Sequence, residues 1–194
     1  MELVVPAQEH LPGYVAALER GWAADRDRPA QWIESERAEI AKGPAQFLAL
    51  QDDREAKGPP ITLPDGTVVA RLPGFRRWIW DGEFCGLIGL RWQNDTNALP
   101  EHVLGHIGYA VVPWKRGRGY ATAALALMLR EVPAQGLEYV ELTTDPDNIA
   151  SQRVIEANGG VLVERFVKTA HYGGKPALRY RIAAQARRTA STSL

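Results

Sequence analysis

The chain has 194 residues, with 23 basic and 23 acidic side chains and therefore a formal net charge of zero. This length suits a single domain, and a composition of 45% hydrophobic and 24% charged residues is typical of a globular protein with a substantial core. A neutral chain has no general electrostatic attraction for polyanions. We therefore expect neither nucleic acid nor a membrane as a partner.

Cys85 is the only cysteine, so no disulfide can form within the chain, as is usual in a reducing compartment. It lies in the apolar run from Phe84 to Ile88, which favours a buried filler over a catalytic thiol. The N-terminal residues lack the basic and then long apolar pattern of a signal peptide, and no apolar stretch approaches the ~20 residues of a membrane-spanning helix. The expected location is cytoplasmic.

Hydrophobic periodicity predicts mostly helices in the first part of the chain. After a polar break at residues 25–29, Trp32, Ile33 and Ile40 share one side of a second helix, which Gly43 and Pro44 end. The expected elements are a strand at 2–5, a helix at 8–22, this second helix, and a charged, Pro-rich surface loop at 51–64.

Strand patterns dominate from residue 67 onward. Asp81-Gly82 is a two-residue hairpin signal between two such strands. The expected elements are strands at 67–72, 75–80, 83–92 and 102–112, a helix at 119–132, a strand at 139–144, a helix at 148–157, and antiparallel strands at 161–168 and 177–182. This order indicates an α/β fold, a mixed sheet with helices on both faces. We expect one domain at 1–185 and a flexible tail at 186–194.

The segment from Pro113 to Thr122 has the composition of an anion-binding site. A strand ends, a turn rich in glycine and arginine follows, and a helix of small residues begins. Gly117 and Gly119 allow unusual backbone angles and close approach of a ligand, while backbone N–H groups and the helix N-terminus supply positive potential. Local charge comes from Lys115, Arg116 and Arg118.

Two common phosphate-binding motifs do not fit this segment. The spacing is not the Gly-x-x-x-x-Gly-Lys-Ser/Thr of nucleotide-hydrolysing P-loops. A dinucleotide fingerprint needs a third glycine where Thr122 stands. Taken alone, the Gly-x-Gly pattern is also compatible with a plain capping loop.

The wider pattern resembles the GNAT superfamily of N-acetyltransferases. Arg116-Gly117-Arg118-Gly119-Tyr120-Ala121 matches its Gln/Arg-x-x-Gly-x-Gly/Ala signature. Residues 148–160 resemble its second motif, which is Asn-x-x-Ser/Ala, then a helix, then Gly-Phe or similar. The Ile-Gly-Tyr and Gly-Tyr-Ala-Thr runs are similar to the ribosomal-protein alanine acetyltransferase branch. The resemblance extends from residue 102 to about 167. It implies a mixed, mostly antiparallel sheet of about seven strands with a splayed central pair.

The resemblance also implies a cofactor site for acetyl-CoA as co-substrate, with no metal. The strand-end residues Val111 and Val112 would offer backbone hydrogen bonds to the pantetheine arm. Asn148 would contact the cofactor near the thioester, with Ser151 beside it, although Asn148 also suits a helix N-cap with Ser151 at N3. The pyrophosphate loop would comprise Arg116, Gly117, Arg118, Gly119, Tyr120, Ala121 and Thr122.

The acid and base are less well defined. His106 lies where some family members carry a catalytic glutamate, and imidazole titrates in the useful range, so it is the candidate base. Weaker alternatives are His102, Glu101 and Glu141, and many members act through water. The position seven residues after Asn148, where many members carry a tyrosine acid, is Ile155. Tyr172 is a substitute candidate for the acid.

The expected reaction is direct attack of a primary amine, from a small molecule or a protein N-terminus, on acetyl-CoA in a ternary complex. No acidic cluster points to a polycationic aminoglycoside acceptor. Because Ile155 stands where many family members carry the tyrosine acid, a non-catalytic acyl-CoA-binding or sensor domain remains an alternative. The chain is expected to be a monomer or a homodimer.

Overall fold

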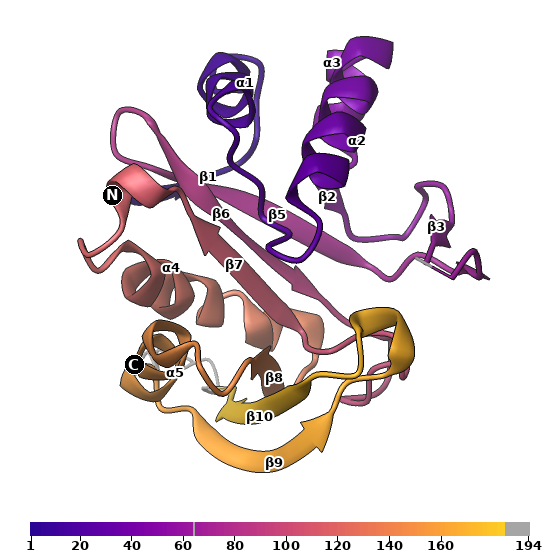
Figure 1. The fold of residues 1–194 in the computed structure, drawn as a ribbon, viewed down its shortest axis with the longest axis vertical. Helices are drawn as coiled ribbons and strands as arrows, with labels where there is room; N and C mark the ends of the chain where they lie inside the picture. Colours follow the sequence, from indigo (N-terminus) through magenta and orange to yellow (C-terminus); the bar gives the residue numbers. More distant parts are fainter. Residues whose placement is uncertain (64, 185–194) are drawn as a thin grey trace, which may run out of the picture.

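The structure, a computed structural model, describes residues 1–63 and 65–184. Its strands form two sheets and a short separate hairpin, and its helices cover both faces of the larger sheet (Figure 1). The predicted tail at 186–194 lies outside the described residues.

The larger sheet has the order β1-β5-β6-β7, and β2 pairs with the first two residues of β5. All its pairings are antiparallel. Its strands are β1 (Glu2–Val4), β2 (Asp52–Asp53), β5 (Gly74–Trp80), β6 (Phe84–Arg91) and β7 (Ile107–Val111). Central β6 is almost continuously apolar because both of its faces are covered.

The smaller sheet has the order β8-β10-β9 and is also antiparallel. Its strands are β8 (Tyr139–Thr144), β9 (Val161–Val167) and β10 (Pro176–Ala183). The last two strands are antiparallel neighbours, which confirms their predicted pairing. The seven longer strands of the two sheets agree roughly with the predicted count.

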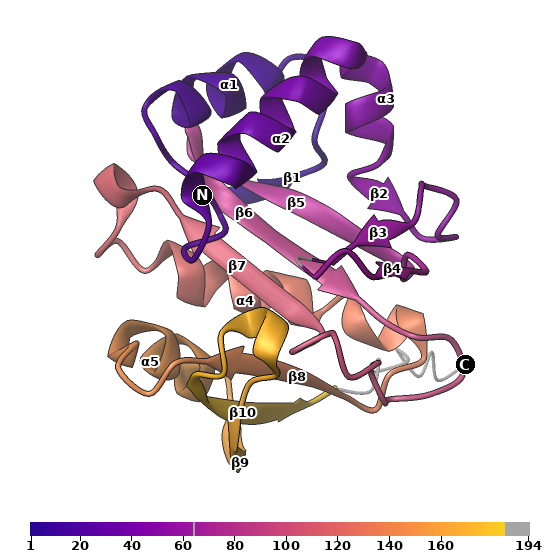
Figure 2. The ribbon, with the colours of Figure 1, turned by 45° about the vertical axis from the view of Figure 1, so that its right-hand side comes forward.

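Helices pack on opposite sides of the larger sheet (Figure 2). One side carries α1 (Leu11–Glu19), α2 (Pro29–Lys42) and α3 (Pro44–Ala49). The other side carries α4 (Tyr120–Leu129), with α5 (Ile149–Ala157) beside it. Short 3-10 turns are η1 (Pro113–Lys115), η2 (Val132–Gln135) and η3 (Ala170–Tyr172).

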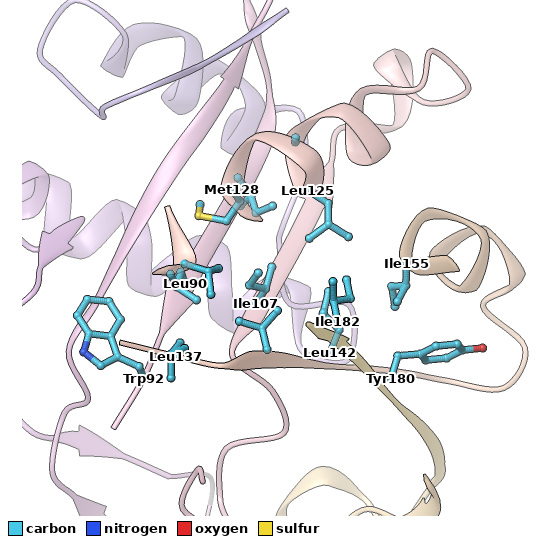
Figure 3. Packing of buried hydrophobic residues seen from close by; sticks show 14 of the residues in the cluster. Leu90, Trp92, Ile107, Leu125, Met128, Leu137, Leu142, Ile155, Tyr180 and Ile182 are labelled. Atoms are coloured by element: carbon cyan, nitrogen blue, oxygen red, sulfur yellow. The ribbon is translucent and has the colours of Figure 1, made fainter. Parts of the chain in front are cut away.

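Two apolar clusters follow from this layering. Under α4 and α5, Leu125 and Met128 point toward Ile107 and Leu142, so one cluster joins the two sheets (Figure 3). On the opposite face, Tyr14 of α1 stacks on Trp78 with ring centroids 4.8 Å apart. Cys85 is fully buried, as its apolar neighbours predicted.

Several predicted boundaries are wrong. The strand predicted at 102–112 begins only at Ile107, because the preceding residues turn to contact β8: the Thr143 hydroxyl donates to Leu104 O. The predicted loop at 51–64 contains β2 and β3 (Ile61–Thr62). The strand predicted at 67–72 is reduced to β4 (Val68–Val69), which pairs with β3.

Gly86 lets β6 approach β7 closely beside the end of β7. Its φ is +148°, and a Cβ there would lie 2.1 Å from Ala110 O and 2.9 Å from Val111 Cα. Gly86→Ala should therefore lower the free energy of unfolding by about 2–4 kcal/mol in urea denaturation.

The matched control is Gly89→Ala on the same strand. Its Cβ would lie 3.3 Å from the flexible side chain of Arg76. Its cost should stay within about 1 kcal/mol. Equal losses for the two variants would contradict the close approach at Gly86.

Candidate functional site

A cleft of about 410 Å³ opens between β7 and β8. The strands run side by side without forming a ladder, and the two sheets part at this line. The segment between α1 and α2 and the η3 turn border the cleft as well. Its lining residues are Ala24, Asp25, Arg26, Asp27, Arg28, Arg91, Leu104, Gly105, Ile107, Gly108, Tyr109, Leu142, Thr143, Thr144, Asp145, Asn148, Ser151, Ile155, Lys168 and Tyr172.

β7 and β8 are joined at His106, directly before β7 begins. The N–H of His106 donates to Glu141 O at 2.8 Å, and the N–H of Glu141 donates to His106 Nδ1 at 3.0 Å. The absence of a side chain at Gly105 permits this approach, since a Cβ there would lie 2.9 Å from Glu141 O. Within the described chain, no further backbone hydrogen bond joins β7 to β8. The predicted splay is therefore present beyond His106.

The His106 side chain belongs to this joint and does not line the cleft. It is fully buried. Burial lowers the pKa of His106 to about 4, so the ring is neutral at physiological pH. An imidazole with no exposed surface cannot reach an ammonium in the cleft, and the geometry therefore favours a structural role over that of the predicted base.

The backbone of β7 presents alternate residues to the cleft. The N–H of Val112 donates to Cys85 O at 2.9 Å, and Val112 is fully buried. Since successive residues of a strand point to opposite neighbours, the backbone groups of Tyr109 and Val111 face the cleft side. The Arg116 Nε, from beyond the strand, donates to Val111 O at 3.2 Å. Val112 has thus used its N–H within the sheet, and Val111 has its N–H on the open side.

The loop before α4 has the free donors of an anion site. Gly117 and Gly119 have φ of +74° and +75°, and Gly119 is the N-cap of α4 without any side-chain cap. Among the described residues, no acceptor is found for six consecutive backbone N–H groups, those of Gly117, Arg118, Gly119, Tyr120, Ala121 and Thr122. Together with the helix dipole, they form a cup suited to a diphosphate.

The charges around the loop divide into two kinds. Lys115 Nζ lies 3.0 Å from both carboxylate oxygens of Asp81 and 3.0 Å from Glu83, so its charge is neutralised. Arg116 and Arg118 are exposed and have no carboxylate partner in the part of the chain that the structure describes. The two arginines are therefore the side chains available to a phosphate.

Asp81 ties the β5–β6 turn to this loop. Besides the Lys115 pair, it accepts a 2.6 Å hydrogen bond from the Tyr120 hydroxyl at the start of α4. The Tyr120 hydrogen bond, together with Lys115, holds the pKa of Asp81 well below its usual range. The sequence identified Asp81 only as a turn residue, and no local pattern predicts its contact with a segment so distant in the chain.

The start of α5 contributes a second set of polar groups. Asn148 is the N-cap and accepts from the N–H of Ser151 at 3.2 Å, which confirms the predicted capping arrangement. The Ser151 hydroxyl lies 2.9 Å from the Tyr109 hydroxyl on β7. Burial raises the pKa of Tyr109, so its phenol keeps its proton at neutral pH. Sequence reasoning missed Tyr109; its position two residues before the strand end was the available signal.

Ile155 and Tyr172 border the same cleft. Ile155 is almost completely buried and offers no proton. The Tyr172 hydroxyl donates to His102 O at 2.8 Å, and burial raises its pKa. Both phenols of the cleft are therefore protonated, but only that of Tyr109 lies against α5.

Within the described residues, no cluster of three or more metal-ligand side chains occurs.

The burial of His106 predicts a pH dependence of stability. The folded pKa lies below the unfolded value, so the unfolded chain binds the proton first and stability is lost as pH falls from 6.5 toward 4. This loss is at most about 3 kcal/mol. His106→Asn, which retains a side-chain acceptor but does not titrate, should show a smaller decrease between about pH 7 and about pH 4.5 in urea unfolding.

Comparison with the variant removes the contribution of the carboxylates, which titrate in both proteins. The quantity to compare is the change in unfolding free energy with pH, because the substitution also alters packing. Parallel curves for the two proteins would contradict the depressed pKa.

Solved structures of acetyltransferases share this fold. The ribosomal L7/L12 α-N-protein acetyltransferase RimL, in complex with coenzyme A, is 15% identical with a TM-score of 0.60, covering 93% of this chain and 92% of that one. A chimera of the spermidine N-acetyltransferase SpeG from Vibrio cholerae with hSSAT is 14% identical with a TM-score of 0.60, covering 95% and 97%. The microcin C7 self-immunity acetyltransferase MccE, in complex with acetyl-CoA and AMP, is 13% identical with a TM-score of 0.54, covering 93% and 91%. At these identities the likeness concerns the fold.

Comparison with curated proteins gives no match. In the described part of the chain, no helix has both the length and the apolar character needed to cross a bilayer. The family model described as an acetyltransferase (GNAT) domain matches residues 6–161, most of the chain, including the splayed strands and the anion-binding loop. The chain therefore belongs to the GNAT acetyltransferase family.

Proposed function

We propose that this protein transfers an acetyl group from acetyl-CoA to the primary amine of a small molecule or a protein N-terminus. The observation that carries the proposal is the cup of six free N–H groups before α4, next to the cleft between β7 and β8. An anion-binding loop adjoining a gap between two strands suits a cofactor with a diphosphate at one end and an extended arm at the other.

The cofactor residues follow from this arrangement. The N–H groups from Gly117 to Thr122 and the side chains of Arg116 and Arg118 bind the diphosphate. The arm lies along the open edge of β7 and hydrogen-bonds to Val111, because Val112 is already bonded to Cys85. Asn148 and Ser151 border the opposite side of the arm.

The reaction is direct attack in a ternary complex. The amine nitrogen bonds to the acetyl carbon, the carbon–sulfur bond breaks, and the amine loses a proton. The carboxylates lining the cleft, Asp25, Asp27 and Asp145, each have a basic partner. Because these carboxylates are engaged by basic side chains, the amine proton passes to water. The backbone N–H of Tyr109, which faces the same open side of β7 two residues earlier, faces the developing negative charge on the thioester oxygen.

The leaving thiolate receives a proton from Tyr109. Its hydroxyl lies in the cleft on β7, is held by Ser151 and keeps its proton at neutral pH. It thereby supplies, from β7, the acid that Ile155 cannot provide from α5. Tyr172 is the second candidate, on the η3 side of the cleft.

The fold likeness leaves the acceptor open. By their names, one neighbour modifies a ribosomal protein and another modifies spermidine. A cytoplasmic location and a monomeric or homodimeric state remain predictions. The rival function is an acyl-CoA sensor without catalysis, which the apolar Ile155 favours.

Cofactor binding is tested by thermal unfolding. Acetyl-CoA at about 100 times its Kd should raise the Tm by roughly 5–10 °C, because it binds only the folded chain. Gly119→Glu should abolish the shift by placing a carboxylate in the cup.

The matched control is Gly136→Glu, beyond the far end of α4. Gly136 has a φ of +74° and an equally open Cβ position, so both variants carry the same backbone strain. Only Gly119→Glu should lose the acetyl-CoA shift. An unchanged Tm of the unmodified protein at saturating acetyl-CoA would exclude both the enzyme and the sensor.

Release of free thiol in the presence of an amine panel separates an enzyme from a sensor. The enzyme produces thiol only when an acceptor is present. Tyr109→Phe should then lower kcat at least about tenfold, because the thiolate loses its proton donor, and should leave the KM for acetyl-CoA nearly unchanged.

Two further tyrosine variants complete this experiment. Tyr139→Phe removes a phenol outside the cleft and should keep full activity. If Tyr172→Phe shows the loss and Tyr109→Phe does not, Tyr172 is the acid. Acetyl-CoA binding without thiol release from any amine would favour the sensor.

A further inference from the structure

The cleft carries an excess of positive charge on its acceptor side. Asp25 pairs with Arg28 at 3.0 Å, Asp27 with Lys175 at 3.0 Å, and Asp145 with Lys168 at 2.5 Å. Every carboxylate lining the cleft is thus neutralised by a basic neighbour. Arg26 and Arg91 line the same cleft, and neither has an acidic partner in the described ranges 1–63 and 65–184.

Arg91 lines the cleft beside β7. It is the last residue of β6, and its side chain is solvent-exposed. Gly108 has no side chain, and a Cβ at that position would lie 3.5 Å from Arg91 Nη2. The guanidinium can therefore lie directly against β7 at Gly108. The nearby Arg76, a like charge, is paired with Glu36 at 3.6 Å, so that carboxylate already has a basic partner.

The position of Arg91 also relates it to the reacting centre. Gly108 precedes Val111 by three residues, which is about 10 Å along a strand. An anion bound by Arg91 would therefore lie several bonds from an amine that reaches the thioester beside Tyr109 and Val111. A guanidinium fork without a side-chain partner among the described residues is suited to a carboxylate or phosphate.

From these contacts we propose that the acceptor is an amine that also carries an anionic group, a carboxylate or a phosphate, which Arg91 binds. Arg26, in the segment between α1 and α2, lines the same cleft and adds to this positive charge. A polycationic amine is disfavoured, because the paired carboxylates of the cleft leave no negative site for a second ammonium. The inference deepens the proposed acetyl transfer and rests on it.

The test compares acceptors that differ only in the anion. 4-Aminobutyrate and O-phosphoethanolamine should be acetylated with a kcat/KM about 10–100-fold above those of propylamine and ethylamine, the same amines without the anion. 1,4-Diaminobutane should be a poor acceptor. Comparison of 4-aminobutyrate with O-phosphoethanolamine shows whether a carboxylate or a phosphate is preferred, and either preference supports the proposal.

Arg91→Ala should reduce this preference to about one, with an unchanged KM for acetyl-CoA, and Arg91→Lys should retain an intermediate preference. Arg37→Ala, an exposed arginine of α2 outside the cleft, is the matched control and should behave as the unmodified protein. Equal rates with and without the anion, a preference for the diamine, or a preference that survives Arg91→Ala would each overturn the inference.

Failure of the proposed function gives a different result. If no amine is acetylated, calorimetric titration with N-acetyl-4-aminobutyrate decides the inference without turnover. Binding that is at least about tenfold weaker in Arg91→Ala supports the anion site, and no difference between the two proteins overturns it.

Discussion

The parting of β7 from β8 is the constraint on which the remainder of this molecule depends. The strands are held together at one end by the two hydrogen bonds between His106 and Glu141. Two strands that lie side by side would ordinarily continue their ladder. Here the larger sheet ends at β7 and the smaller one begins at β8, so a polar backbone edge remains exposed inside the protein. Such an edge is costly unless it binds a ligand or water.

Much of the fold was predictable from the sequence. The turn at Asp81-Gly82, the helix stop at Gly43-Pro44 and the glycine-rich start of α4 are local signals, and each lies where it was predicted. The family followed from two motifs at a suitable separation, and the matched region confirms it. Longer elements were predicted well because their hydrophobic periodicity repeats over many residues. Short pieces such as α3 and the β3–β4 pair have too few residues for a periodic signal.

The chemistry of the site was less predictable, because it depends on contacts between distant segments. His106 has the residue type of a base, but its burial arises from packing between the two strands. Tyr109 reads as an ordinary strand residue until α5 brings Ser151 to its hydroxyl. Asp25 and Asp27, which follow α1, are likewise defined by distant or local partners, since they pair with Arg28 and Lys175. This pairing leaves unpaired positive charge in the cleft, and a count of charged residues does not show it. Net charge describes the chain, whereas recognition depends on which charges remain unpaired.

The contact of Asp81 with Lys115 and Tyr120 has a consequence for the energetics of cofactor binding. It fastens both ends of the glycine-containing loop to the tip of a rigid hairpin, so the loop has its shape before any ligand arrives. A flexible glycine loop would lose conformational entropy on ordering around a diphosphate. In this protein that entropy is lost during folding, and the affinity for an anion is correspondingly less reduced by loop ordering.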